Sequence, residues 1–294
     1  MPMDFSFFLI QLLSGLSGAM ILFLLASGLT LIFGVMNILN FAHATMWLLG
    51  GYITFSLYEY FGGGGALVLL GAIIVGTLVM AALGFAVERL LIRRMYEREL
   101  PEQLLLTFAL VLIIGDAIKL VWGVEDRAIY LDIEPLEFLD TFLNPYYFVI
   151  ISVGVAVAAG LWAFLQKTRY GKIVRAAVYS RDMVSALGIR IPLIYAGVFA
   201  LGVGIAAFAA GVFLPLMPMA LGVDIDLIVQ CFAVVVIGGF GSILGTFVAS
   251  LIVGIVYAFS ILIWPDGALA VVFLIVVGVL IWRPWGLFGT EMRY

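Results

Sequence analysis

Three polar side chains interrupt a long apolar run near the start of the chain. Asn37, Asn40 and His43 recur at three-residue spacing within residues 28–52, a stretch that contains no Asp, Glu, Lys or Arg. On a helix, this spacing places the three side chains on one face. If they faced lipid without partners, each would cost about 2–3 kcal/mol. We therefore expect all three to face protein or water, where they either join helices by hydrogen bonds or line a substrate pathway.

Few other residues offer catalytic or metal-binding chemistry. His43 is the only histidine and Cys231 the only cysteine, which excludes a HExxH metal site, a thiolate metal site and a disulfide framework. Gly171-Lys172 lacks the first glycine and the Ser/Thr of a phosphate loop, so the chain has no nucleotide-binding motif of its own and is not expected to be an enzyme. Ser242 and His43 could be paired as in a protease, but a glycine-rich break in a helix explains Ser242 better.

Ion coupling would require ionisable groups inside the bilayer. The only such candidates are Asp116 and Lys119, which are three residues apart near the outer end of an apolar run over 104–122. We interpret them as an interfacial ion pair whose side chains reach toward water. Without an array of buried carboxylates, proton or sodium coupling is not expected, and the energy for active transport would come from a partner.

A polar segment over 171–191 carries the signals of a short helix. Ser180 is a predicted N-cap, Asp182 lies favourably in the first turn, and Gly188 suits a left-handed C-cap before Pro192. These signals predict a helix over 181–187. Its apolar face would hold Met183, Ala186 and Leu187. That face needs a covering surface, which is either this protein's own helix ends or a partner subunit.

Composition indicates the kind of elements that must position these residues. Of 294 residues, 65% are apolar and 11% charged, and the mean hydropathy is +1.26. A soluble protein devotes about a quarter of its residues to charge. We therefore expect an all-α polytopic membrane protein, with residues 1–294 forming a single transmembrane domain. The net charge of −4 argues against nucleic-acid binding.

Apolar runs long enough to cross a hydrocarbon layer of ~30 Å predict eight or nine transmembrane helices, some short or broken. Two fit between Asp4 and Glu59, and the others are near 66–87, 104–122, 146–166, 192–214 and 268–282, with a further long run over 227–263. This last run is too long for one crossing and contains Gly238, Gly239, Gly241 and Gly245. The glycines predict a break that serves either as a hinge or as a site of close helix packing. Residues 28–45 and 227–242 either span fully or re-enter.

Basic residues set the expected orientation. The segments 88–103 and 166–191, together with Arg283 and Arg293, hold twelve of the fourteen Lys and Arg residues. By the positive-inside rule, both segments and the C-terminus face the cytoplasm. Two crossings within 227–263 then give nine passes, with the N-terminus outside and the C-terminus inside.

Three segments together carry a family resemblance. The amino-acid sequences of residues 28–52, 175–189 and 238–245 resemble those of bacterial branched-chain amino-acid ABC transporter permeases. The resemblance is in particular to their shorter, H-type subunit. The similarity extends over nearly the whole chain. Ala177, Asp182, Ala186 and Gly188 match positions of the family's cytoplasmic coupling loop, here about 171–191. Ala44 departs from the family pattern, which commonly has Gly after the His.

The resemblance implies a transport complex of several subunits in the bacterial cytoplasmic (inner) membrane. It implies a second homologous permease subunit, two cytoplasmic ATPase subunits that bind ATP, and a periplasmic solute-binding protein, with no cofactor in this chain. The coupling residues would be Ala177, Asp182, Met183, Ala186, Leu187 and Gly188. The substrate would be a branched-chain amino acid. Two alternatives stay open. The first is an ABC transporter permease for urea, short amides or another small organic solute, and the second is an ion-coupled carrier or channel that works without partner subunits.

Overall fold

The computed structural model describes residues 5–138 and 141–289, and it is built almost entirely of α-helices. The long helices are α1 (Phe5–Met36), α2 (His43–Tyr60), α3 (Ala66–Leu90), α4 (Leu100–Trp122), α5 (Tyr146–Lys167), α8 (Ile191–Phe213), α9 (Val223–Gly238), α10 (Ile243–Ile263) and α11 (Ala268–Trp282). The short elements are η1 (Ile92–Met95), α6 (Arg169–Tyr179), α7 (Arg181–Ala186) and η2 (Pro265–Gly267).

The predicted all-α polytopic class is confirmed. Among the described residues, seven segments are long and apolar enough to cross a membrane, including one that begins at η2 and contains α11. The two remaining long helices, α2 and α9, have 18 and 16 residues, or about 27 and 24 Å of helix. α9 largely coincides with 227–242, one of the two segments for which the sequence left both a full span and a re-entrant piece open.

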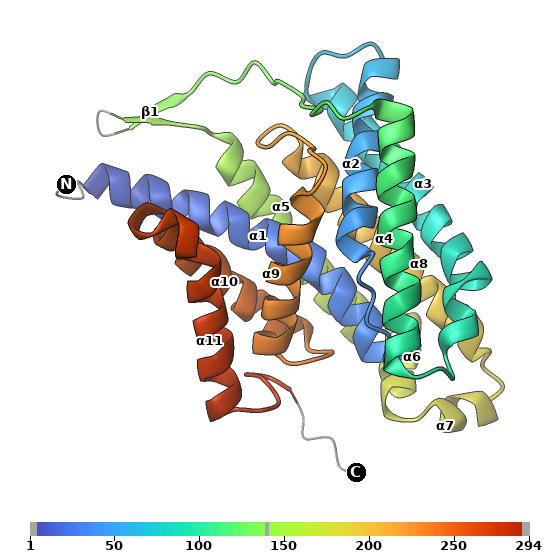
Figure 1. Ribbon diagram of the computed structural model, residues 1–294. Helices are drawn as coiled ribbons and strands as arrows, with labels where there is room; N and C mark the ends of the chain where they lie inside the picture. The colour runs from blue at the N-terminus through green and yellow to red at the C-terminus, as the bar shows by residue number, and fades with distance from the viewer. Residues whose placement is uncertain (1–4, 139–140, 290–294) are drawn as a thin grey trace.

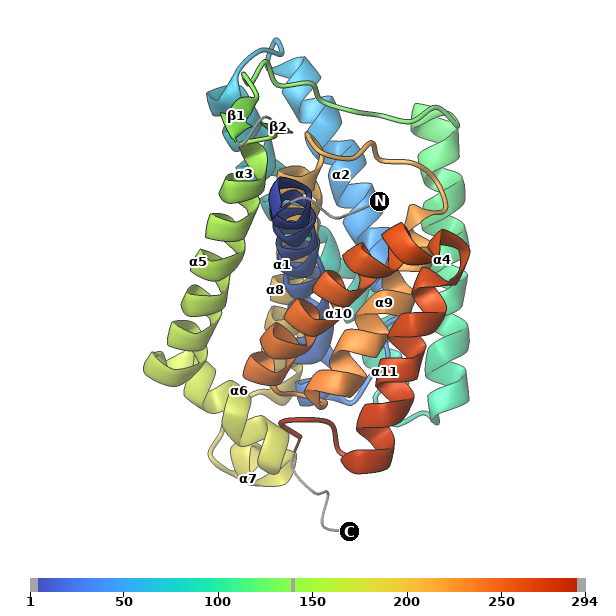
Figure 2. The same cartoon turned by 90° about the vertical axis from the view of Figure 1, so that its left-hand side faces the viewer.

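The bundle is organised around α1 and α8, which are buried along most of their length. Figure 1 shows α1 inclined across the bundle, and it packs mainly against α10, α8 and α5. α3, α4, α5 and α11 lie around this centre, as the rotated view in Figure 2 shows, and few of their residues are buried. Because their exposed residues are largely apolar, the outer helices suit contact with lipid or with another membrane subunit.

The two ends of the bundle differ in charge. The segments 91–99 and 168–190 and the turn 239–242 all lie at the lower end in Figure 1. The acidic segment 123–138 and residues 141–145 lie at the upper end and contain a small antiparallel pair of strands, β1 (Leu136–Phe138) and β2 (Thr141–Leu143). The predicted break of 227–263 into two helices is confirmed, because α9 and α10 lie on either side of the turn 239–242. That both of them cross the membrane fully stays a prediction. That the basic end faces the cytoplasm stays a prediction, and Arg293 lies outside the described residues.

The glycine-rich turn between α9 and α10 has two roles in the fold. Gly239 and Gly241 have φ values of 94° and 79°, which only glycine adopts at little cost. Ser242 begins α10, because its hydroxyl accepts the N–H of Gly245 at 3.1 Å. A Cβ atom on Gly238 would lie 2.6 Å from the carbonyl carbon of Gly245, so the two helices touch backbone to backbone. Both close packing and a special backbone are present, whereas hinge motion stays a prediction.

Candidate functional site

The link between α1 and α2 is not helical. Asn37 ends α1 with a φ of 56°, a left-handed conformation that Asn tolerates better than most residues. Residues 37–42 then form an irregular connection before His43 begins α2. The expectation that Asn37, Asn40 and His43 share one helix face is therefore wrong, because the chain leaves the helix at Asn37. Asn37 is exposed, whereas Asn40 and His43 are completely buried, so these last two face protein as expected.

The link returns into the middle of the bundle. His43 Nε2 lies 3.1 Å from the carbonyl oxygen of Leu25. Leu25 is eleven residues before the end of α1, which corresponds to about 16 Å along the helix axis. α2 thus begins inside the bundle rather than at its surface (Figure 1). Irregular backbone at such a depth occurs in membrane proteins only where it is buried in protein or lines a water-filled cavity.

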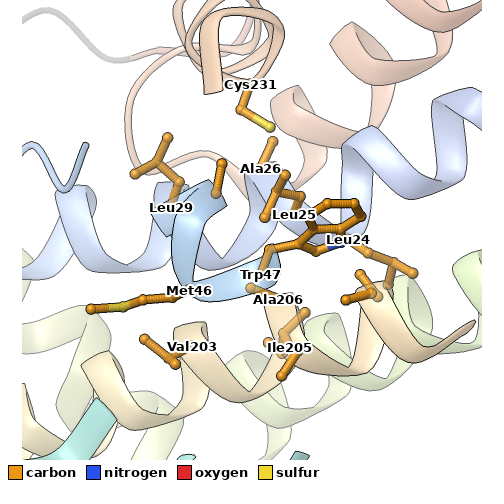
Figure 3. Packing of buried hydrophobic residues seen from close by; sticks show 14 of the residues in the cluster. Leu24, Leu25, Ala26, Leu29, Met46, Trp47, Val203, Ile205, Ala206 and Cys231 are labelled. Atoms are coloured by element: carbon orange, nitrogen blue, oxygen red, sulfur yellow. The ribbon is translucent and has the colours of Figure 1, made fainter. Parts of the chain in front are cut away.

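Glycines make room for the start of α2. A Cβ atom on Gly28 of α1 would lie 2.9 Å from His43 Nε2 and 2.6 Å from the carbonyl oxygen of Gly202 in α8. His43 therefore lies at a point where α1 and α8 approach closely. Figure 3 shows the first turns of α2 between these two helices, with Met46 and Trp47 among apolar side chains of both.

Several buried polar atoms around this start have no hydrogen-bond partner among the described residues. They are both amide atoms of Asn40, Nδ1 of His43, Nε1 of Trp47 and the hydroxyl of Tyr52. An unpaired buried donor or acceptor costs about 1–3 kcal/mol, so such a group is normally explained by water or a bound molecule. Together these atoms offer both donors and acceptors along the first half of α2.

A buried carboxylate lies beside the same turn. Asp224, in the first turn of α9, is 6% exposed and accepts a hydrogen bond from the Thr45 hydroxyl at 2.5 Å. No basic side chain lies within 4.0 Å of it in the described part of the chain. The positive end of the helix dipole favours an anion at this position. Nothing in the sequence around Asp224 singled this residue out, since no local pattern shows that Thr45 lies beside it.

A second buried carboxylate lies near the basic end. Glu88, 1% exposed, accepts a hydrogen bond from the Tyr96 hydroxyl. With Asp224, it corrects the expectation that the bundle lacks buried carboxylates. Asp116 and Lys119, in contrast, form an exposed ion pair at 3.1 Å, as expected. Ser242 and His43 use their polar atoms with different partners, Gly245 and Leu25, which does not favour a protease pair.

The short helix predicted at the basic end is confirmed as α7. The Ser180 hydroxyl accepts the N–H of Met183 at 3.2 Å, and Gly188 follows the helix with a φ of 81°. Val184 is buried and anchors α7 on the bundle. Met183 and Leu187 are 68% and 75% exposed, so the apolar face points away from the chain's own core.

The remaining coupling candidates divide between the surface and the interior. Asp182 and Ala186 are exposed on α7. Ala177 is 2% exposed within α6 and packs inside the chain, so any influence of Ala177 on a partner would act through the position of α6.

The long apolar helices of the described residues and the link that returns among them define a multi-pass membrane protein. The family described as "Branched-chain amino acid transport system / permease component" matches residues 11–281. Because this match covers most of the chain, the protein belongs to that family. The family is one of transport permeases of the cytoplasmic membrane, and its description makes each member one component of a larger system.

Similar curated proteins come from distant organisms. A high-affinity branched-chain amino acid transport system permease protein, BraD of Pseudomonas aeruginosa, is 28% identical over 96% of both chains. The corresponding LivH protein of Escherichia coli is 27% identical over 88% of both chains. A probable LivH permease of Methanocaldococcus jannaschii is 28% identical over 82% of this chain and 78% of its own length. No solved structure matches this chain significantly.

Proposed function

We propose that this chain is a membrane-spanning subunit of an ATP-driven importer for branched-chain amino acids. The observation that carries the proposal is the family match over residues 11–281. The similar proteins BraD of Pseudomonas aeruginosa and LivH of Escherichia coli are permeases for this substrate class. The buried residues around the start of α2, which include Met46 and Trp47, are apolar, as contact with aliphatic side chains requires.

The pathway for the amino acid runs past the start of α2. Leucine, isoleucine and valine carry an ammonium and a carboxylate group that both need polar partners in the bundle. Asn40, His43 and Trp47 supply unpaired polar atoms there, and the Asp224 carboxylate can accept hydrogen bonds from an ammonium group. Broken helices whose ends meet the charged groups of a substrate are a common arrangement in transporters. Asn37, at the exposed end of α1, belongs to the basic-side end of this pathway.

Energy reaches the pathway through partner subunits. In this proposal a second homologous permease subunit completes the membrane part, two cytoplasmic ATPases bind ATP, and a periplasmic solute-binding protein delivers the amino acid. α7 inserts Met183, Ala186 and Leu187 into a groove on an ATPase. Asp182 stabilises the start of α7 or pairs with a basic group of that partner. The exposure of these apolar side chains supports the role.

Uptake in cells tests the substrate class. The gene is deleted, and uptake of labelled leucine, isoleucine and valine is measured with and without a plasmid copy, beside uptake of labelled urea and acetamide. The proposal predicts that only amino-acid uptake is lost on deletion and restored by the plasmid. Loss of urea or amide uptake instead would favour the other solute class. Uptake that survives removal of the ATPase genes would indicate an ion-coupled carrier.

A further inference from the structure

A pocket of about 620 Å³ opens at the basic end of the bundle. The end of α3 and the residues after it form one wall, and the segment from α7 to the start of α8 forms the other. Its lining includes Phe85, Glu88, Arg89, Arg93, Arg190 and Leu193. The pocket is separate from the start of α2, and its chemistry does not depend on which solute the permease carries.

The charge of this pocket is positive. Three arginines face one carboxylate, and that carboxylate, Glu88, already accepts a hydrogen bond from Tyr96. No acidic side chain lies within 4.0 Å of the guanidinium groups of Arg89, Arg93 or Arg190 in the part of the chain that the structure describes. Guanidinium groups bind phosphate in a bidentate manner. The pocket is therefore built for an anion with several oxygen atoms.

The pocket is also continuous with an apolar surface. Along α3, Leu67, Ile74 and Leu78 are 84%, 50% and 64% exposed. They are seven and four residues apart, and steps of three or four residues lead on through Ala82 to Phe85 and Arg89, so these side chains follow one stripe down the helix. Leu193, on the opposite wall, is 59% exposed. A ligand in the pocket would thus have its polar end among arginines and room for a hydrocarbon chain along α3.

We propose that this pocket binds the phosphate headgroup of an anionic phospholipid, whose acyl chains lie against the exposed stripe of α3. Basic pockets between transmembrane helices on the cytoplasmic side are suited to such headgroups. Ser185 and Gly188, at the end of α7, also line the pocket. A lipid bound there touches the same short helix that we assign to the ATPase contact, so it stabilises the position of α7.

Lipid retention by the assembled complex tests the proposal. The permease is purified with its partner subunits from membranes that contain phosphatidylglycerol and phosphatidylcholine in equal amounts, and bound lipid is counted by native mass spectrometry. The intact protein is expected to retain phosphatidylglycerol preferentially. Each arginine near an anionic lipid contributes about a five-fold gain in binding. Replacing Arg89, Arg93 and Arg190 with glutamine should therefore lower this preference by on the order of 100-fold.

A matched variant replaces Arg94, Arg169 and Lys172 with glutamine. These residues are also exposed at the basic end but do not line the pocket, so the same charge is removed and lipid retention should stay near normal. Equal retention of the two lipids, or equal loss in both variants, would overturn the proposal. Displacement of the lipid by millimolar inorganic phosphate would overturn it in favour of a site for free anions. Loss of the ATPases with unchanged lipid retention would indicate a protein ligand instead.

Discussion

The Thr45 hydroxyl donates a hydrogen bond of 2.5 Å to the Asp224 carboxylate. This bond joins the first turn of α2 to the first turn of α9, two short helices that both begin inside or near the interior of the bundle. The N-terminal ends of two helices therefore meet at one buried carboxylate. Ionisable groups are retained inside membrane proteins mainly where they serve a pathway or a ligand.

Asp224→Asn tests whether the charge at this junction takes part in transport. Asparagine keeps the size of the side chain and an oxygen that can accept the Thr45 hydrogen bond, but it removes the negative charge. We expect normal insertion and a rise in the KM for leucine uptake of about tenfold, or ~1.4 kcal/mol. Asp116→Asn, which changes an exposed carboxylate of α4, is the control and should transport normally. An unchanged KM in Asp224→Asn would exclude the carboxylate from the pathway.

Asn40→Leu separates transport from packing. The Asn40 amide is fully buried with neither polar atom paired among the described residues. A leucine of similar size avoids the cost of burying that amide, which is about 1–3 kcal/mol. We expect the thermal unfolding temperature in detergent to stay the same or rise, while amino-acid uptake falls at least tenfold. If stability and uptake fell together, Asn40 would be a packing residue.

The sequence predicted best those features that depend on neighbouring residues. α7 follows from Ser180, Asp182 and Gly188, because caps and first-turn charges act within a few residues of the chain. The turn between α9 and α10 follows from its glycines for the same reason. Both appear in the structure where they were expected.

Features that depend on tertiary contacts could not be predicted in the same way. Asn37 ends a helix that its apolar neighbours would continue, and the chain then returns into the bundle, where Gly28 makes room for His43. Asp224 and Glu88 stand next to loops in the sequence, yet other helices cover them. The arginines that line the pocket between α3 and α8 are about a hundred positions apart in the sequence. Local sequence patterns cannot predict that such residues lie close together.

Gly188→Val tests the coupling role of α7. Gly188 has a φ of 81° and open space where a Cβ atom would lie, so the cost of valine comes from the left-handed backbone and is about 1–2 kcal/mol. We expect the variant to insert normally but to lose copurification of the ATPases and substrate-stimulated ATP hydrolysis. Gly188→Asn, which tolerates this backbone, should keep both. Full assembly and transport in Gly188→Val would exclude α7 as the coupling helix.

Gly245→Ala tests the close contact of α9 and α10. An added Cβ atom would lie 2.8 Å from the carbonyl carbon of Gly238, so backbone rather than a movable side chain must shift. We expect a loss of stability of about 1–3 kcal/mol, measured by denaturant unfolding in detergent. Gly278→Ala, in α11 with no neighbour within 4 Å, is the matched control and should cost nothing. Equal stability of the two variants would show that this contact is not rigid.

Reconstituted transport tests the central claim most directly. The chain and its partner subunits are placed in proteoliposomes with the solute-binding protein, and leucine flux is measured with ATP supplied at the face of the ATPases. We predict flux that requires ATP, the ATPases and the binding protein together, and that persists after ion gradients are collapsed. Leucine flux by this chain alone, driven by a proton or sodium gradient and indifferent to ATP, would contradict the account.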